Sequence, residues 1–329
     1  NEYYEVRLNP GKGYGCFALK PIQRGTRILA DSPLLIVREP EYLYDDIKAT
    51  YDKLSPTDQA LYMSLHSAHN QDPANWPKAI HPSVKGRERK RIEEQASARF
   101  AKEPSLISIF QTNCIEHESG AAIFPYAARF NHSCSPNACF TWNSAIGKET
   151  IHATRNINCG EEITVAYCDT THSKSLRRYE LKHYGFLCDC RACNDESDPE
   201  YASKSAERRY RLQELEDLLA SMRESGKHWG MGPESIPQLL EMVNLLLEEG
   251  DYTNRLAATY MDIALVCEAQ GDLKFAKKAA EKALQVSVDC YGLDHPTMMD
   301  HFILYERLKD KMEGGKAKSE DAVENEVDS

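Results

Sequence analysis

Three cysteines in the segment CDCRAC form a dense group of side chains that can bind metal. Cys188, Cys190 and Cys193 fall within six residues of one another. Zinc in proteins is held by four ligands in a tetrahedron, and thiolate sulfur is a preferred ligand. Three thiols so close together leave one position to be filled from elsewhere, and Cys134 is the candidate. The alternative is a set of free thiols in a reducing compartment, but the spacing favours a metal site.

Cys134 belongs to the segment RFNHSCSPN, residues 129–137, which also carries Asn131 and His132. The proline restricts the residue before it to extended conformations, so we expect the segment to turn out of a strand. The amide and the imidazole offer hydrogen bonds to a flat heterocycle and to its charged substituents. An Asn-His pair alone is typical of an ordinary loop, but its position beside a metal ligand indicates a binding role.

A glycine-rich stretch, NPGKGYGCF at residues 9–17, is the next candidate for binding. Its glycines at positions 11, 13 and 15 let the backbone turn sharply and approach a ligand without a Cβ in the way. The alternative is a plain glycine-rich hairpin. The stretch does not open a helix, so a dinucleotide-binding turn has little support.

Around these motifs the chain alternates between strand-like and helical stretches. Residues 1–40 read as short strands and turns, and residues 41–110 have a polar, helical pattern. Residues 111–168 return to strand character in the segments AAIFP, NACFTWN, ETIHATRNI and EEITVAYC. The sequence therefore predicts small sheets that are interrupted by a helical insertion.

From about residue 203 the apolar residues recur at helical spacing. The segment from Tyr252 to Tyr291 resembles one helix pair of the tetratricopeptide type, with Gln270-Gly271-Asp272 as the turn. Small residues should let the two helices pack closely, namely Ala276, Ala280 and Ala283. Residues 314–329 have no apolar period and are predicted to form a disordered acidic tail.

The composition limits the class of protein and its partners. The length of 329 residues suffices for two or three domains. A formal net charge of −11 argues against direct binding of nucleic acid by the whole surface, whereas it would attract a lysine-bearing partner. No apolar run is long enough to cross a membrane, and the first residues lack the pattern of a signal peptide. The odd number of cysteines, 11, then indicates a reducing compartment, so we expect the cytoplasm, the nucleus or both.

One basic run has two interpretations. The segment KGRERKR, Lys85–Arg91, could be a nuclear localisation signal. It could equally form a solvated helix face, because Glu93 and Glu94 follow at distances that suit i,i+4 pairing.

Taken together, NHSCSPN, GEEITVAY and CDCRAC resemble, in order and spacing, the motifs of the SET-domain protein lysine methyltransferases. The chain is most similar to the SET-and-MYND branch of that family, over residues 5–40 and 105–194. One departure is clear, since that branch carries a cysteine-rich MYND zinc finger within the insertion. Residues 17–113 contain no cysteine, so the finger is absent here.

The resemblance implies an α+β fold. A SET domain of short β-sheets with a pseudoknot would be split by the helical insertion and followed by an all-α, tetratricopeptide-like domain. The implied parts are a first SET segment, an insertion, a second SET segment, a post-SET zinc-binding segment, the helical domain and the tail, at residues 1–40, 41–110, 111–182, 183–194, 195–313 and 314–329.

The resemblance also implies roles for single residues. The cofactor would be S-adenosylmethionine, and the residues matching its contacts are Lys12, Gly13, Tyr14, Asn113, Asn131, His132, Tyr167 and Phe186. Tyr167 matches the active-site tyrosine and, with Tyr184, a wall of the lysine channel. Structural Zn²⁺ would be bound by Cys134, Cys188, Cys190 and Cys193. The pattern around Asn113 departs from the family at Cys114-Ile115.

The implied function is transfer of a methyl group to the side-chain amine of a lysine in a histone or nonhistone protein. The alternative is a SET-fold scaffold with weak or no catalysis, whose helical domain binds a protein partner. Retention of Asn131, His132 and Tyr167 favours the enzyme, because a decayed site would be free to lose any of them. The departure at Cys114-Ile115, the missing finger and the repeat-like helices keep the scaffold interpretation open.

Overall fold

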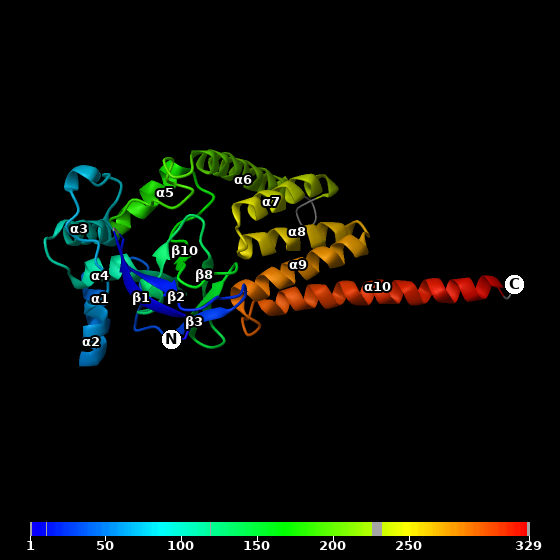
Figure 1. Ribbon diagram of the computed structural model, residues 1–329, viewed down its shortest axis with the longest axis horizontal. Coiled ribbons are helices and arrows are strands. Elements are labelled where there is room, and N and C mark those ends of the chain that lie inside the picture. Colours follow the sequence, from blue (N-terminus) through cyan, green and yellow to red (C-terminus); the bar gives the residue numbers. More distant parts are fainter. Residues whose placement is uncertain (1, 11, 119, 226–231, 328–329) are drawn as a thin grey trace.

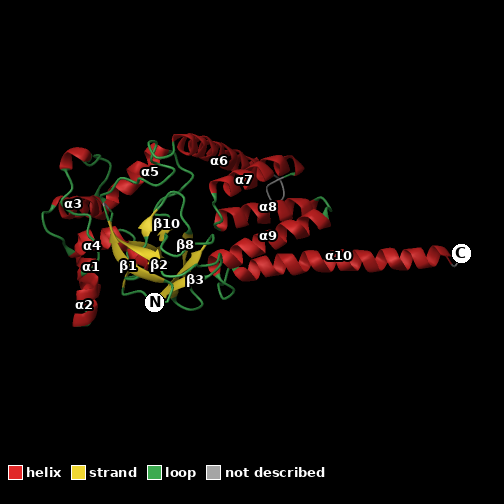
Figure 2. Cartoon of the chain, viewed as in Figure 1, coloured by secondary structure: helices red, strands yellow, loops and turns green. Residues whose placement is uncertain are grey.

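The computed structural model describes residues 2–10, 12–118, 120–225 and 232–327. Short sheets lie in the middle of the molecule, helices of the insertion lie at one end, and the C-terminal helices lie at the other (Figure 1). Coloured by secondary structure, Figure 2 shows the strands enclosed between these two helical parts. The α+β fold and the C-terminal helical region expected from the sequence are therefore confirmed.

The described strands form one four-stranded sheet and two three-stranded sheets. The first has the order β1-β2-β10-β7, the second β3-β9-β8 and the third β4-β6-β5. The strands are β1 (Tyr4–Asn9), β2 (Gly13–Ala18), β3 (Arg27–Asp31), β4 (Leu35–Val37), β5 (Cys114–His117), β6 (Gly120–Ile123), β7 (Asn131–His132), β8 (Ala138–Asn143), β9 (Lys148–Ala153) and β10 (Glu162–Val165).

The four-stranded sheet joins the two halves of the split SET region. Strand β10 pairs antiparallel with β2, with Glu162 opposite Phe17. On its other edge β10 pairs parallel with β7, with Thr164 opposite Asn131. The glycine-rich hairpin and the NHSC segment therefore flank the same central strand, although they are far apart in the sequence.

The helices of the insertion are short and have their own core. They are α1 (Tyr44–Tyr51), α2 (Pro56–Met63), α3 (Gly86–Phe100) and α4 (Leu106–Asn113), with the 3₁₀ turn η1 (Pro73–Asn75). Ser55 caps the start of helix α2, since its side chain accepts a hydrogen bond from the amide of Asp58, and Pro56 is the first helical residue. Ile47, Tyr62 and Phe110 are fully buried in this core.

Two further helical elements follow β10, before the C-terminal region, and a 3₁₀ turn precedes β7. They are α5 (Lys174–Leu181), η3 (Lys182–Tyr184) and η2 (Ala127–Arg129). The C-terminal helical region comprises α6 (Pro199–Ser225), η4 (Pro233–Ser235), α7 (Ile236–Glu249), α8 (Asn254–Ala269), α9 (Leu273–Tyr291) and α10 (Met298–Val327). Among the described residues, no helix is both long and apolar enough to span a membrane.

The helix pair predicted between Tyr252 and Tyr291 is confirmed as α8 and α9. Gly271 in the turn has a φ of 81°, which a glycine adopts without strain. The three alanines named above are each at most 1% exposed, so α9 packs closely on its neighbours.

The end of the chain differs from the expectation of a disordered tail. Helix α10 continues through Val327 and extends away from the rest of the molecule (Figure 1). Half of the residues after Gly314-Gly315 are Ala, Lys or Glu, which are strong helix formers, and none is proline. Residues 328–329 of that predicted tail lie outside the described residues.

Candidate functional site

Asn131 holds the glycine-rich hairpin against the NHSC segment. Its side-chain amide donates to the carbonyl of Tyr14 at 3.0 Å and to the carboxylate of Glu162 at 2.8 Å. Glu162 also accepts a hydrogen bond from Asn9. A Cβ on Gly15 would lie 2.8 Å from the amide nitrogen of Asn131 and closer still to the carboxylate of Glu162, so a larger residue here would displace both side chains.

Lys12 connects the same hairpin to the cysteine-rich segment. Its ammonium lies 2.5 Å from the carboxylate of Asp189, which stands between Cys188 and Cys190. The glycine-rich hairpin, the NHSC segment and the CDCRAC segment, which are separate motifs in the sequence, therefore lie together in the fold.

His132 links Tyr167 to the cysteine cluster. Its Nδ1 accepts a hydrogen bond from the backbone amide of Tyr167 at 3.0 Å. Burial lowers the pKa of His132 to about 4, so the ring is neutral at pH 7 and its proton resides on Nε2. That nitrogen lies 3.3 Å from Cys134 Sγ and donates to it.

An aromatic cluster surrounds Tyr167. The centroid of its ring lies 4.7 Å from that of Tyr184, 5.4 Å from His132 and 6.5 Å from Phe186. The hydroxyl of Tyr167 donates to the carbonyl of Phe130 at 2.5 Å. Burial raises the pKa of Tyr167 above its usual value and that of Tyr184 to about 12, so both phenols keep their protons at neutral pH.

Tyr167 and Tyr184 also line a cavity of about 380 Å³. Asn113 lines it too, and its buried amide donates to the carbonyls of His66 and Ile109. The other lining residues are Thr112, Cys114, Ile115, Glu116, Ala127, Ala128, Phe140, Thr141, Trp142, Glu149 and Val165. Tyr167 therefore contacts His132 and Phe186 and also borders this cavity.

The four predicted metal-binding cysteines are brought together. The Sγ atoms of Cys134, Cys188, Cys190 and Cys193 all lie within 4.8 Å of one another. Two of these separations are 3.9 Å and 3.5 Å. Sulfurs at ~2.3 Å from a tetrahedral zinc lie ~3.8 Å apart, so the residues fit a Cys₄ zinc site.

A buried arginine donates hydrogen bonds to two of these four sulfurs. Arg177 on α5 donates from Nε to Cys134 Sγ at 3.1 Å and from Nη2 to Cys193 Sγ at 3.5 Å. Its side chain is 2% exposed. A guanidinium in this position favours thiolate over thiol, which is the form that binds metal.

The C-terminal helices contact the site directly. Arg209 on α6 donates to the carbonyl of Cys134 at 2.8 Å and pairs with the buried carboxylate of Glu249 at 2.8 Å. This contact fixes the backbone of the NHSC segment against the helical region.

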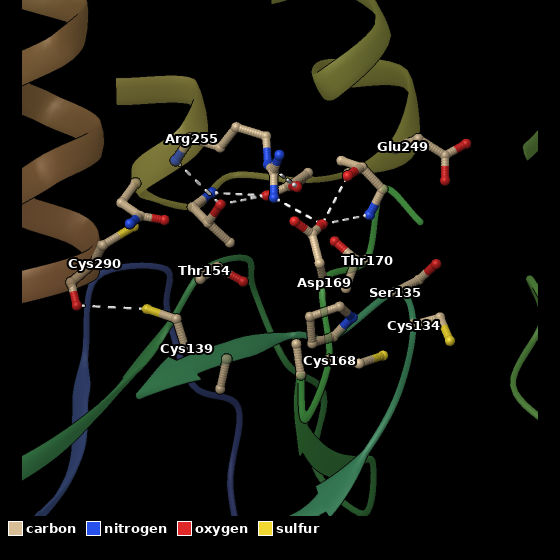
Figure 3. A pocket seen from close by; sticks show the side chains of 18 of the residues that line it. Cys134, Ser135, Cys139, Thr154, Cys168, Asp169, Thr170, Glu249, Arg255 and Cys290 are labelled. Atoms are coloured by element: carbon tan, nitrogen blue, oxygen red, sulfur yellow. Dashed lines mark hydrogen bonds and ion pairs between the residues drawn. The ribbon is translucent and has the colours of Figure 1, made fainter. Parts of the chain in front are cut away.

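A second cavity, of about 260 Å³, lies between the SET region and the C-terminal helices (Figure 3). On one side Arg255 of α8 pairs with Asp169 at 2.9 Å. On the other, Cys139 Sγ donates to the carbonyl of Cys290 at 3.5 Å, and the close-up shows both contacts bordering the cavity (Figure 3). The two regions are thus joined by polar contacts around an internal space.

Sequence analysis missed several residues that organise this site. Glu162, Asp189, Arg177 and Arg209 hold the predicted residues in place. Glu162 lies in the GEEITVAY motif, which offered a signal, whereas Arg177 and Arg209 lie in helices without any distinguishing pattern.

Comparisons with known proteins agree with this arrangement. A family described as "SET domain" matches residues 13–168. "Histone-lysine N-methyltransferase set5" of Schizosaccharomyces pombe is 31% identical over 196 residues, which cover 59% of this chain and 51% of that protein. The chain thus spans about half the length of that relative.

Two further relatives are similar over different lengths. "Putative SET domain-containing protein L678" of Acanthamoeba polyphaga mimivirus is 31% identical over 191 residues, 55% of this chain and 74% of that protein. "N-lysine methyltransferase SMYD2-B" of Xenopus laevis is 38% identical over 99 residues, 27% of this chain and 23% of that protein. With its split sheets, its NHSC segment and its cysteine cluster, the chain belongs to the SET-domain family.

Proposed function

We propose that this chain transfers a methyl group from S-adenosylmethionine to the side-chain amine of a lysine in a protein substrate. The observation that carries the proposal is the position of Tyr167. On one side it contacts His132 and Phe186, and on the other it borders the aromatic cavity with Tyr184. The S. pombe and X. laevis relatives are named as lysine methyltransferases, which supports lysine as the acceptor.

The cofactor would be held by the hairpin, the NHSC segment and the exposed ring of Phe186. The backbone of Lys12, Gly13 and Tyr14 would meet it, since Asn131 fixes that turn. The side chain of His132 is occupied by protein contacts, so its backbone is the part left for the cofactor. Asn113 is assigned to the same function, with its amide nitrogen already bonded within the protein.

The cavity would prepare the lysine for reaction. S-adenosylmethionine, when bound, supplies a methyl group activated by a positively charged sulfur. The acceptor amine must be neutral, although a free lysine has a pKa near 10.4. Desolvation between Tyr167, Tyr184 and Phe140 disfavours the ammonium form, and the Tyr167 side chain would orient the amine.

The four cysteines would hold a structural Zn²⁺, because four thiolates leave no open coordination position. Tyr184 and Phe186 lie four and two residues before Cys188 in the chain, so the metal would fix the aromatic residues of the site.

We place the protein in the cytoplasm or nucleus, where protein lysines are available. We assign the C-terminal helical region to the binding of the substrate or of a protein partner.

Calorimetric titration of S-adenosylmethionine tests the proposal. We expect binding with a micromolar or lower dissociation constant in the native protein. In Asn131→Ala it should be at least about tenfold weaker, about 1.4 kcal/mol, because the hairpin loses its anchor to the NHSC segment. Asn158→Ala, on an exposed turn, is the matched control and should bind as the native protein does.

If the titration gives no heat and S-adenosylhomocysteine does not compete, the methyltransferase proposal is wrong. The interpretation as a SET-fold scaffold then remains.

A further inference from the structure

Glu149 is a buried carboxyl without a partner. Its residue is 1% exposed, and neither carboxylate oxygen has a hydrogen-bond partner among the described residues. Buried polar groups without partners are uncommon and cost about 1–3 kcal/mol each, more when charged. The proposed methyl transfer as described above makes no use of this group.

The neighbours of Glu149 do not satisfy it. On β9 it lies opposite Asp31 of β3 and Trp142 of β8, so the three side chains share one face of the sheet. The carboxylate of Asp31 is already occupied, since it accepts hydrogen bonds from the backbone amides of Tyr126 and Ala127. Burial and then the nearby Asp31 raise the pKa of Glu149 to about 8.

Trp142 adds a second unpartnered group. Its indole Nε1 is buried and makes no hydrogen bond within the described residues, and the same holds for Nε2 of His117. The two rings pack edge to face with centroids 4.4 Å apart. Near the turn of the β8–β9 hairpin, several polar atoms of neighbouring side chains therefore lack hydrogen-bond partners within the described residues.

Both Glu149 and Trp142 line the cavity that Tyr167 borders. Its lining includes two acidic residues, buried Glu149 and exposed Glu116, whereas no Lys, Arg or His is found among its described lining residues. Phe140 and Trp142 add aromatic rings, whose faces attract cations. An acidic carboxyl that can ionise and these rings together suit a positively charged side chain.

That cation differs from the lysine that is methylated. A carboxylate beside the reacting amine would favour its ammonium form and oppose the reaction. The reacting lysine would therefore lie beside Tyr167 and Tyr184, whereas Glu149 would bind a side chain that remains positively charged.

We propose that Glu149 and Trp142 form a recognition subsite for a second basic side chain, arginine or lysine, of the protein substrate. The inference rests on the proposed methyl transfer for the identity of its substrate. On binding, the carboxyl releases its proton to solvent and pairs with the cation, while the ring of Trp142 packs on it.

The test is affinity selection from a positional-scanning library of peptides with one fixed central lysine. Selection uses the full chain with saturating S-adenosylhomocysteine, so it does not depend on turnover. We expect the native protein to enrich arginine or lysine over glutamine about tenfold or more at one flanking position. Glu149→Gln should reduce that enrichment to about twofold or less, and Trp142→Phe should reduce it partly.

Glu5→Gln is the matched control, because it removes the same charge from an exposed position on β1 and should keep the preference. The melting temperature of Glu149→Gln should be equal to or above that of the native protein, since an unpaired buried acid is removed. A native protein without basic preference, or a Glu149→Gln variant that retains it, overturns the subsite.

Methylation of the same library by labelled S-adenosylmethionine separates the two proposals. If the preference for basic residues depends on Glu149 but no methyl group is transferred, the methyltransferase proposal is wrong and the recognition subsite is supported. Methyl transfer without that preference would remove the subsite alone.

Discussion

Replacement of Tyr167 by phenylalanine is expected to lower the rate of methyl transfer about 100-fold or more. The cofactor dissociation constant should stay within about threefold. The variant keeps the ring that packs on His132 and Tyr184, but it loses the hydroxyl and leaves the carbonyl of Phe130 without its donor. The reacting amine would then be misaligned in an otherwise formed cavity. Transfer of tritium from labelled S-adenosylmethionine to proteins of a cell extract measures the rate, and calorimetry measures the affinity.

Tyr179→Phe provides the control for this substitution. Tyr179 is 61% exposed on α5, so loss of its hydroxyl should change neither rate nor affinity. Full activity in Tyr167→Phe would end the role assigned to this tyrosine, and a large loss of cofactor affinity would indicate a structural role instead.

Loss of the cysteine cluster should have the second large effect. We expect about one zinc per chain in purified protein and much less in Cys190→Ser, because three thiolates remain to hold the metal. The segment from Tyr184 to Cys193 should then exchange its amide hydrogens faster. Cofactor binding should fall at least about tenfold, since Phe186 and the partner of Lys12, Asp189, lie in that segment. Elemental analysis, hydrogen exchange and calorimetry measure these three results.

Cys159→Ser is the matched control, because Cys159 is an exposed free thiol outside the cluster. It should retain zinc and cofactor binding. Pure native protein that contains no zinc would rule out the four-thiolate site, whatever the variants do.

The sequence predicts the parts of this site whose chemistry is local. Three thiols within six residues need a fourth ligand, and the approach of Cys134 to Cys193 at 3.5 Å agrees with that expectation. The strands around the NHSC segment and the α8–α9 pair were likewise predictable, because apolar spacing and turn residues are read along the chain.

Residues that act only through tertiary contact were not predictable. Arg177 looks like any exposed arginine of a polar helix until the fold brings it to within 3.1 Å of Cys134 Sγ. Glu149 lies between Lys148 and Thr150 near the start of its strand, where a charged residue would be expected to face solvent. It is 1% exposed, with Asp31 of β3 and Trp142 of β8 opposite it in the sheet, and no local pattern reveals these neighbours.

The pairing of β10 with β2 has a consequence for biosynthesis. Tyr14 and Asn131 are 117 residues apart, and the intervening helices have their own core. On the ribosome, the β1–β2 hairpin and the insertion can form while β10 is still unmade, so one edge of β2 stays open in the nascent chain. The unpaired backbone N–H and C=O groups of such an edge can form hydrogen bonds with a strand of another chain. Chaperone protection of the emerging protein should therefore matter most until β10 and the cysteines after it have left the exit tunnel.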